Sequence, residues 1–374
     1  MTPSELKVLF ISRSYPPVVG GMEILSYHLT TTIDCKKKII ALKKWSRAHI
    51  IWFLPVAFFN ALLNLKKFDI IHFSDGLTAS LGIPLRILYK KKIFVSNVHG
   101  LDITFQNKNG ILAKAYGVYI RLLAKKQPHL WIANSRNTRK LALACGLKNV
   151  KIIYPGIDPD EFCYMHNPKH LSDVLKKKYN RNNIYILTLG RLTRRKGQKW
   201  FIENVMPELP DHIHYIVAGK SYILEGRDER QILMETASKI GLADRVIFID
   251  APSNETRLKL LCACSLFVMP NFPVEGDVEG FGMVAIEAGA SGTVVVASAL
   301  EGIRDAIAEG ITGYLVEPGN ANEFIDKIKE LISDIDSLEY QGNAAREHIQ
   351  AHFSWKSICR SYLKAFSELK GGSA

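Results

Sequence analysis

A chain of 374 residues is roughly twice the usual domain length of about 150, so two domains with separate cores are expected. Its composition, 47% hydrophobic and 23% charged, excludes an intrinsically disordered chain and fits a globular one. The net charge of +13 is concentrated in one half, because residues 1–156 hold 24 Lys and Arg against 6 Asp and Glu, whereas the remainder holds 25 against 30.

This uneven charge bears on the partners of the protein. A basic half favours an anionic surface, either a membrane leaflet or nucleic acid. The simpler alternative is that the charge serves solubility and a phosphate-bearing substrate.

The first predicted element is a strand at Val8–Ile11, an apolar run too short for a secretory signal. The loop after it contains Gly20 and Gly21 and leads into a helix expected to start near Met22. Glycines at this place let backbone N–H groups approach an anion at the positive end of a helix. The same pair is also typical of an ordinary tight turn.

The next distinctive segment is Ala48–Leu63, which is uncharged, rich in Ile, Trp, Phe and Leu, and flanked by basic residues. It is somewhat shorter than the roughly 20 residues of a transmembrane helix. We expect a helix that lies on a membrane, with a buried helix as the alternative and a true span as the least favoured reading. Residues Lys36–Lys67 would then supply the docking surface.

Short apolar runs continue along the chain at helix-length intervals. In the first half they are Ile70–Phe73, Ile93–Val98 and Leu130–Ala133; in the second they are Tyr185–Leu189, His214–Ala218, Val246–Ile249, Leu266–Met269, Thr293–Ala297 and Gly313–Val316. Strands that alternate with helices predict right-handed βαβ units and parallel sheets. Prolines and a glycine within residues 152–162 interrupt the pattern, so we place a domain boundary after Gly156.

A basic turn follows the first strand of the second half, in the motif Gly190-Arg-Leu-Thr-Arg-Arg-Lys-Gly197. A strand that ends in glycine brings Arg191 and Lys196 to the carboxyl edge of the sheet, where doubly wound folds bind ligands. Two cations there would neutralise a diphosphate and stabilise it as a leaving group. A solvated basic turn is the alternative.

The most specific motif places two carboxylates, Glu279 and Glu287, eight positions apart across a glycine turn and the start of a helix. A helix entered after Gly282 points free N–H groups at a phosphate. Glu287, about one turn inside, can accept hydrogen bonds from vicinal hydroxyls such as a ribose diol. Glu279, before the turn, would face the sugar.

The sequence Glu279-Gly-Phe-Gly-Met-Val-Ala-Ile-Glu287 resembles the E-x7-E signature of retaining glycosyltransferases of family 4, which adopt the GT-B fold. Further motifs resemble those of the family in the same order along the chain: Gly20–Glu23, His99-Gly100, Tyr154–Asp158, Gly190–Gly197 and Phe353–Trp355. The resemblance implies an α/β fold of two facing Rossmann-like, doubly wound domains with a cleft between them. It implies an acceptor-binding domain at 1–156, a donor-binding domain at 157–352, and a C-terminal helix within 353–374 that packs back on the first domain.

The resemblance also implies roles for particular residues. Arg191 and Lys196 would bind the donor diphosphate, Glu287 the ribose, and Glu279 the donor sugar, while His99 would lie across the cleft near sugar and acceptor. The catalytic set is then His99, Arg191, Lys196 and Glu279. The donor-binding set adds Gly20, Gly21, Gly280, Phe281, Gly282, Met283, Val284 and Glu287.

Retention in this family is described as a front-face reaction, in which the departing phosphate helps to deprotonate the acceptor hydroxyl. A glycosidase would instead need a nucleophile and an acid on either side of one bond. No D-x-D pair follows a strand, since Asp158 and Asp160 lie in the linker. We therefore expect a metal-independent enzyme that uses a nucleoside-diphosphate sugar as donor and has no cofactor.

The six cysteines support the same expectation of no metal. They are Cys35, Cys145, Cys163, Cys262, Cys264 and Cys359, and their only close pair lacks the C-x-x-C spacing of zinc and redox sites. We expect reduced packing residues in a cytoplasmic protein.

Two rival interpretations remain open. A sugar-nucleotide epimerase or a phosphorylase could share the architecture. A non-catalytic basic module that binds membranes or nucleic acid would explain the charge but leave Arg191, Lys196, Glu279 and Glu287 unexplained. We favour a hexosyltransferase acting on a glycan or lipid-linked acceptor in cell-surface polysaccharide or glycolipid synthesis, peripheral on the inner face of the cell membrane, with no nucleic-acid partner.

Overall fold

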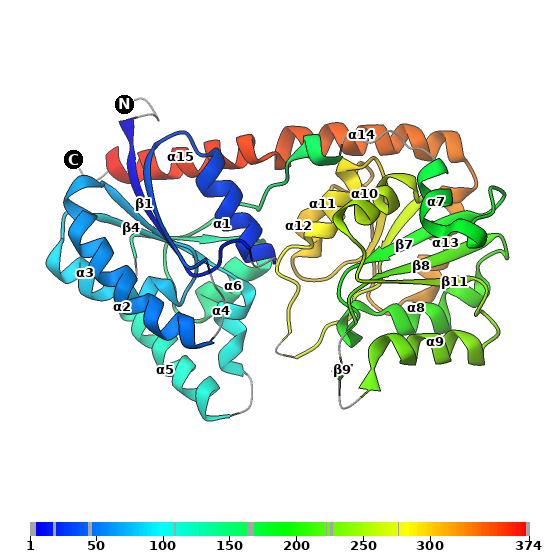
Figure 1. Ribbon diagram of the computed structural model, residues 1–374, viewed down its shortest axis with the longest axis horizontal. Helices are drawn as coiled ribbons and strands as arrows, with labels where there is room; N and C mark the ends of the chain where they lie inside the picture. Colours follow the sequence, from blue (N-terminus) through cyan, green and yellow to red (C-terminus); the bar gives the residue numbers. More distant parts are fainter. Residues whose placement is uncertain are drawn as a thin grey trace. The chain divides into compact units, whose positions relative to one another are not determined.

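The computed structural model describes residues 5–17, 20–43, 47–107, 110–126, 128–162, 168–221, 223–224, 227–275 and 277–371. The chain divides into two compact units, one of Met1–Gly156 with Phe353–Ala374 and one of Ile157–His352 (Figure 1). The division falls after Gly156, where the prolines and glycine of the linker interrupt the alternation of strands and helices.

The first unit is a sheet of six parallel strands covered by helices. Its elements are β1 (Lys7–Ser12), α1 (Gly21–Thr32), β2 (Lys36–Ala41), α2 (Arg47–Asn64), η2 (Leu65–Lys67), β3 (Ile70–Phe73), η3 (Thr78–Leu81), α3 (Gly82–Leu88), β4 (Ile93–Val98), α4 (Gly100–Thr104), η4 (Phe105–Asn107), α5 (Ile111–Lys125), β5 (Leu130–Ala133), α6 (Arg136–Ala144), β6 (Val150–Ile152) and α15 (Trp355–Gly371), where η marks a 3₁₀ turn. The strand order is β2-β1-β3-β4-β5-β6.

Successive residues of a strand point to opposite faces of the sheet, and two separate cores result. Leu9 and Ile11 of β1 belong to the core under α2, α3, α5 and α6. Val8 and Phe10 belong to the other core, which α1 and α15 cover. Figure 1 shows α15, in red, beside α1, and the two helices are in contact. The last helix of the chain is therefore a structural part of the first unit.

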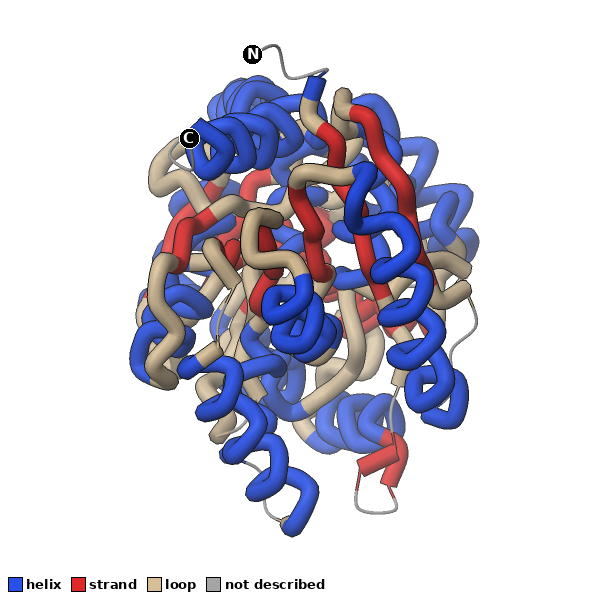
Figure 2. The backbone as a smooth tube through the Cα atoms, turned by 90° about the vertical axis from the view of Figure 1, so that its left-hand side faces the viewer, coloured by secondary structure: helices blue, strands red, loops and turns tan. Residues whose placement is uncertain are grey.

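The second unit repeats the architecture with its own parallel sheet. Its elements are η5 (Pro159–Phe162), α7 (Pro168–Leu175), η6 (Lys176–Lys178), β7 (Ile184–Leu189), η7 (Arg194–Lys196), α8 (Gln198–Asn204), η8 (Met206–Glu208), β8 (Ile213–Gly219), β9 (Ile223–Leu224), β10 (Arg227–Asp228), α9 (Glu229–Lys239), β11 (Val246–Asp250), α10 (Asn254–Ala263), β12 (Leu266–Met269), α11 (Met283–Ala290), β13 (Val294–Ser298), α12 (Ile303–Ala306), β14 (Gly313–Val316), α13 (Ala321–Ile332) and α14 (Ile335–Phe353). The order of the six-stranded sheet is β11-β8-β7-β12-β13-β14. The short pair β9 and β10 is antiparallel. Figure 2, by comparison, shows strands of the first unit, in red, with helices on both sides of them.

Each sheet has one point where the strand order reverses, which is where open α/β sheets bind ligands. In the first unit it lies between β1 and β3, and in the second between β7 and β12. These are the places where a site is expected from topology alone.

All ten apolar runs read from the sequence are strands, with ends within two residues of the expected ones. Two further strands of the large sheets, β2 and β6, were missed. β2 is an edge strand that begins with Lys36, Lys37 and Lys38, and lysine is a residue that natural proteins place on sheet edges to prevent further pairing. β6 has only three residues and lies at the other edge.

The segment Ala48–Leu63 is helical, as expected, and forms most of α2. Among the helices in the described ranges, none combines the length and hydropathy of a membrane-spanning segment. None of the five described cysteines forms a disulfide, and Cys163 lies outside the described residues.

Candidate functional site

The reversal point of the second sheet holds a cluster of charged side chains. Lys196, in the turn after β7, and Glu279, in the loop after β12, lie with Nζ and Oε2 2.7 Å apart. The same Oε2 is 2.7 Å from Nη1 of Arg195 and accepts a hydrogen bond from Asn271 Nδ2 at 3.3 Å. Three donors from two loops therefore converge on one carboxylate oxygen.

A glycine in each motif has a positive φ, and one of the two lies against the other loop. Gly197 has φ of 72°, and a Cβ at this residue would lie 1.8 Å from the carbonyl oxygen of Pro270. Gly282 has φ of 85° and starts α11. Because side chains are disfavoured at positive φ and no Cβ fits beside Pro270, both positions favour glycine. The glycines of the two motifs thus shape the backbone around the charged cluster.

Glu279 is ionised in this setting. Burial by itself would raise its pKa, but Lys196 and Arg195 outweigh burial and lower the pKa to about 2. The Glu279 backbone N–H donates to the Glu301 carboxylate, which fixes the loop before Gly280. The charge and the position of Glu279 are therefore both set by neighbouring groups.

The two arginines that flank the turn differ in their surroundings. Arg195 is 4% exposed and also lies 3.2 Å from Asp277, so it is buried between two carboxylates. Arg191, which the sequence assigns to the diphosphate, is exposed after β7. Arg195 holds Glu279 in place, and Arg191 has the solvent access that a diphosphate contact requires.

Glu287 lies in the second turn of α11, on the helix that begins after Gly282. Its Oε2 is 2.7 Å from Arg257 Nη1, and Arg257 Nη2 is 3.2 Å from Glu161 Oε1. The Arg257 guanidinium also lies over the ring of Phe162 at 5.4 Å. Burial raises the pKa of Glu287, Arg257 opposes this rise, and Glu161 adds to it. Arg257, on α10, therefore joins η5 to the carboxylate expected to hold the ribose.

The remaining expected donor contacts lie in and beside the start of α11. Phe281 is buried, and Gly280, Met283 and Val284 are partly exposed. The first N–H groups of a helix have no partner within the helix and carry partial positive charge. The start of α11 is thus suited to an anion.

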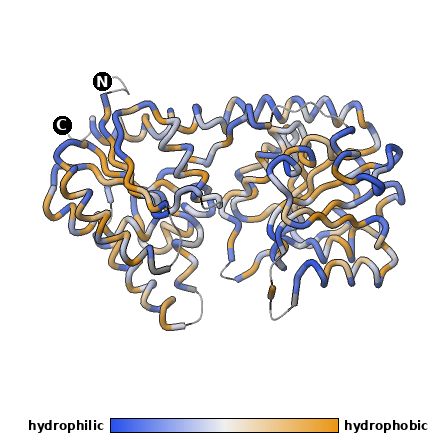
Figure 3. Tube along the Cα trace, in the orientation of Figure 1, coloured by the Kyte–Doolittle hydropathy of each residue, from blue (hydrophilic) through white to orange (hydrophobic). Residues whose placement is uncertain are grey.

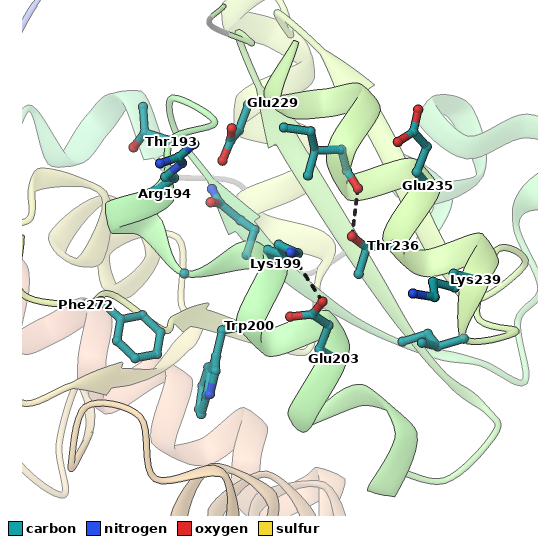
Figure 4. Close-up of a pocket in the computed structure, with 14 residues that line it drawn as sticks. Thr193, Arg194, Lys199, Trp200, Glu203, Glu229, Glu235, Thr236, Lys239 and Phe272 are labelled. Carbon is teal, nitrogen blue, oxygen red and sulfur yellow. Dashed lines mark hydrogen bonds and ion pairs between the residues drawn. The ribbon is translucent and has the colours of Figure 1, made fainter. Parts of the chain in front are cut away.

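A cleft of about 930 Å³ is lined in part by the basic turn. Its walls come from η7, α8 and α9 and include Arg194, Lys199 and Trp200 (Figure 4). Neither Glu279 nor Glu287 lines it. This cleft is therefore distinct from the charged cluster.

The reversal point of the first sheet also holds an ion pair. Arg13, directly after β1, lies with Nε 2.9 Å from Oδ2 of Asp75, which follows β3. Asp75 is fully buried and accepts from the Thr78 backbone N–H at 2.8 Å. The carboxylate both caps the next turn and fixes the arginine at the sheet edge.

His99 lies beside this pair, after β4, and is held at two points. Its backbone N–H donates to Asp102 Oδ2 at 2.9 Å, an arrangement like a capping box at the start of α4. Its Nε2 is 3.1 Å from the Ser74 carbonyl oxygen. A carbonyl oxygen only accepts, so Nε2 is the donor of this hydrogen bond. His99 is thus fixed both at its backbone and at its ring.

Asp102 is buried, and its carboxylate holds the backbone of His99. It also accepts from the Gly76 N–H at 3.2 Å. Burial raises its pKa, as does Asp75, whereas His99 lowers it. Gly20 and Gly21 are at the start of α1 in the same unit, as the sequence predicts, and Val18 and Val19 lie outside the described residues.

Two family models match the chain and together cover most of it. Residues 172–348 match the model of glycosyl transferases group 1, and residues 10–161 match that of glycosyltransferase family 4. The chain belongs to glycosyltransferase family 4.

Individual glycosyltransferases resemble it over nearly its full length. An uncharacterized glycosyltransferase of Methanocaldococcus jannaschii is 25% identical over 96% of this chain and 98% of its own. A D-inositol 3-phosphate glycosyltransferase of Kribbella flavida is 26% identical over 82% of this chain and 73% of its own. The structure of HepE from Anabaena in complex with UDP has the same fold, with a TM-score of 0.76 at 19% identity over 97% of this chain and 100% of that one.

The glycosyltransferase therefore has the GT-B fold expected from its motifs. The structure gathers Lys196 and Glu279 in one cluster and places Glu287 on the helix that follows. Sequence reasoning missed several residues that hold these side chains: Arg13, Asp75, Asp102, Glu161, Arg195, Arg257, Asn271 and Glu301. Only Arg195 carried a local signal, since it lies inside the basic motif.

Proposed function

We propose that this glycosyltransferase moves a hexosyl residue, with retention, from a nucleoside-diphosphate sugar to a hydroxyl group of a glycan or lipid-linked acceptor. This sugar transfer would contribute to cell-surface polysaccharide or glycolipid synthesis at the inner face of the cell membrane. The observation that carries the proposal is the Lys196–Glu279 pair at the reversal point of the second sheet, followed eight residues later by Glu287.

The donor fits this arrangement part by part. The Lys196 ammonium has three N–H donors, so it can keep Glu279 and still reach a phosphate oxygen. The start of α11 supplies backbone N–H groups to the same diphosphate. Glu287 is an acceptor for the two ribose hydroxyls, and Glu279 for hydroxyls of the sugar.

The proposed step breaks the bond between the anomeric carbon and the diphosphate oxygen and forms a bond from that carbon to the acceptor oxygen on the same face. The acceptor proton goes to an oxygen of the departing diphosphate. Lys196 and Arg191 stabilise the negative charge that grows there. His99 would orient the acceptor, consistent with the two contacts that fix its backbone and its ring.

The names of similar proteins guide the choice of ligands. HepE is described in complex with UDP, and the Kribbella flavida relative is named for D-inositol 3-phosphate. UDP-sugars are therefore the first donors to test here, with GDP- and ADP-sugars beside them.

A thermal-shift screen of the three donor classes tests the proposal. One class should raise the melting temperature of the wild type, and Glu287→Ala and Lys196→Ala should abolish this shift. Lys199→Ala is the matched control, because Lys199 is a half-exposed lysine on α8 that pairs with Glu203 at 3.5 Å. The proposal fails if no donor class stabilises the wild type, or if the two site variants respond like the control.

A further inference from the structure

The outer side of α2 is apolar where a surface helix is normally polar. Trp52, Val56, Phe59 and Leu63 are 75%, 60%, 62% and 81% exposed. Their spacing of four, three and four residues places them in one line along the helix, which we call the α2 stripe. No Lys, Arg, Asp or Glu occurs from Ala48 to Asn64.

The inner side of α2 already serves the core. Phe53, Ala57 and Ala61 are buried against the sheet of the first unit. The stripe is therefore not needed for the packing of this unit. Figure 3 shows the segment of α2 coloured mainly as hydrophobic.

Two other helices on the same side of the sheet also expose apolar residues. The exposed residues are Ile87 and Leu88 at the end of α3, and Ile111, Leu112, Val118 and Leu122 on α5. Buried residues of α2, α3 and α5 belong to one core, so the three helices cover one side of the sheet. Large exposed apolar surfaces of this kind mark interaction sites.

The charged residues in this part of the first unit are mostly basic. Residues 36–126 contain 17 Lys and Arg against 3 Asp and Glu. All three acidic residues are engaged elsewhere, because Asp69 pairs with Lys370, Asp75 pairs with Arg13, and Asp102 is buried and holds the backbone of His99.

Exposed cations follow these apolar residues along the chain or share a helix with them. Lys66 and Lys67 follow α2, Lys90 and Lys91 follow α3, and Arg121 and Lys125 are on α5. Two lysines of β2 have other contacts, since Lys37 donates to the Ile33 carbonyl at the end of α1 and Lys38 to the Asn64 side chain at the end of α2. Of the docking surface expected at Lys36–Lys67, α2 and the two lysines after it are retained here, and residues of α3 and α5 are added.

We propose that the first unit binds an anionic lipid surface with the α2 stripe inserted among the acyl chains and the surrounding cations against the headgroups. The proposal rests on the proposed function, since it names the surface on which a lipid-linked acceptor is met. A helix with this pattern lies in the plane of the membrane.

The same observations disfavour a second copy of the chain as the occupant. A twofold contact would bring the same basic patch of both copies together, and like charges would face each other. An anionic lipid surface complements both the cations and the apolar residues.

Vesicle flotation tests the proposal with the full-length chain. Vesicles of phosphatidylcholine with phosphatidylglycerol should bind the wild type, and binding should persist in part at high salt, where surface charge interactions are screened. The triple variant Trp52→Ser, Phe59→Ser, Leu63→Ser should lose about tenfold or more of its partitioning. Tyr340→Ser is the control, because Tyr340 is 79% exposed on α14 in the other unit.

The outcomes separate the alternatives. Equal partitioning of the triple variant and wild type overturns the insertion, as does binding that salt abolishes completely. A dimer in sedimentation that the triple variant converts to a monomer would identify a second copy instead. Because the variants leave the second unit unchanged, their melting shift with nucleotide sugars reports on the proposed function separately.

Discussion

Lys196 and Glu279 lie 2.7 Å apart although 83 positions separate them in the chain. They meet because β7 and β12 are neighbours at the reversal point of the second sheet, and each is followed by a loop that crosses the carboxyl edge. A sheet order of this kind makes one site from two distant motifs.

Replacement of Lys196 by Met should lower kcat/KM by about a hundredfold to a thousandfold, because the cation proposed to stabilise the departing diphosphate is lost. Steady-state kinetics with the donor found by the thermal screen would measure this. Lys199→Met should retain wild-type kinetics, since Lys199 pairs with Glu203 away from the cluster. An unchanged kcat/KM for Lys196→Met would remove this residue from the reaction.

Replacement of the two carboxylates of the motif should have different effects on ligand binding. Glu287→Gln should weaken the binding of the nucleoside diphosphate and of the nucleoside-diphosphate sugar to the same extent, by about tenfold to a hundredfold, because the ribose that Glu287 is proposed to bind is common to both ligands. Glu279→Gln should weaken the nucleotide sugar more than the nucleoside diphosphate. Calorimetric titration of both ligands measures the difference, and an equal loss in Glu279→Gln would contradict a contact with the sugar.

His72 should make the first unit sensitive to acid. Burial lowers its pKa from 6.5 to about 4, an effect that the hydrogen bond with Asn97 opposes and His99 reinforces. The folded state then binds fewer protons than the unfolded state between these values, so stability falls as the pH decreases below 6.5. The contribution of His72 between pH 7.5 and pH 5 is about 2 kcal/mol.

The variant His72→Gln isolates this contribution, because its side chain can still donate to Asn97. Urea unfolding of both proteins at several pH values should give a flatter pH dependence for the variant. If the free energy of unfolding depends on pH in the same way in both proteins, the protonation of His72 does not change on unfolding.

Asp102→Ala should destabilise the protein by about 1 to 3 kcal/mol, because the buried N–H groups of His99 and Gly76 lose their acceptor. Asp102→Asn should recover most of this loss, since the amide oxygen can accept both bonds and burial already raises the pKa of Asp102. Unfolding free energies test the order of the three proteins. If the Asp102→Asn and Asp102→Ala variants are equally unstable, the charge of Asp102 rather than its hydrogen-bond acceptor stabilises the fold.

Turnover should be insensitive to millimolar EDTA, because Lys196 and Arg191 are expected to neutralise the diphosphate without a metal ion. Initial rates before and after chelation, with Mg²⁺ added back, measure this. Loss of activity that Mg²⁺ restores would contradict a metal-independent enzyme.

The sequence allowed the fold and the main motifs to be predicted because both depend on local patterns. Buried parallel strands are short apolar runs, and the basic and acidic motifs begin where such runs end. The edge strand β2 was not predicted, because its first three residues, Lys36, Lys37 and Lys38, give it neither an apolar run nor an alternation of apolar and polar residues. A three-residue strand such as β6 has too few residues to show one.

The residues that hold the site could not be predicted, since their partners are distant in sequence. Arg257 reaches Glu161 across 96 positions and Glu287 across 30. Arg195 is next to Lys196, and only packing shows that both side chains are buried against Glu279. Such contacts depend on tertiary structure and leave no spacing rule in the sequence.

The position of α15 in the first unit affects how the protein is made. The ribosome synthesises this helix about 200 residues after the rest of its unit, which at 5 to 20 residues per second takes about 10 to 40 s. During that time the face of the sheet formed by Val8, Phe10 and Ile70 lacks the cover that Tyr362 and Phe366 later provide. The first unit therefore leaves the ribosome first, but its core is completed last. Until α15 is made, the nascent chain exposes an apolar surface to which chaperones could bind.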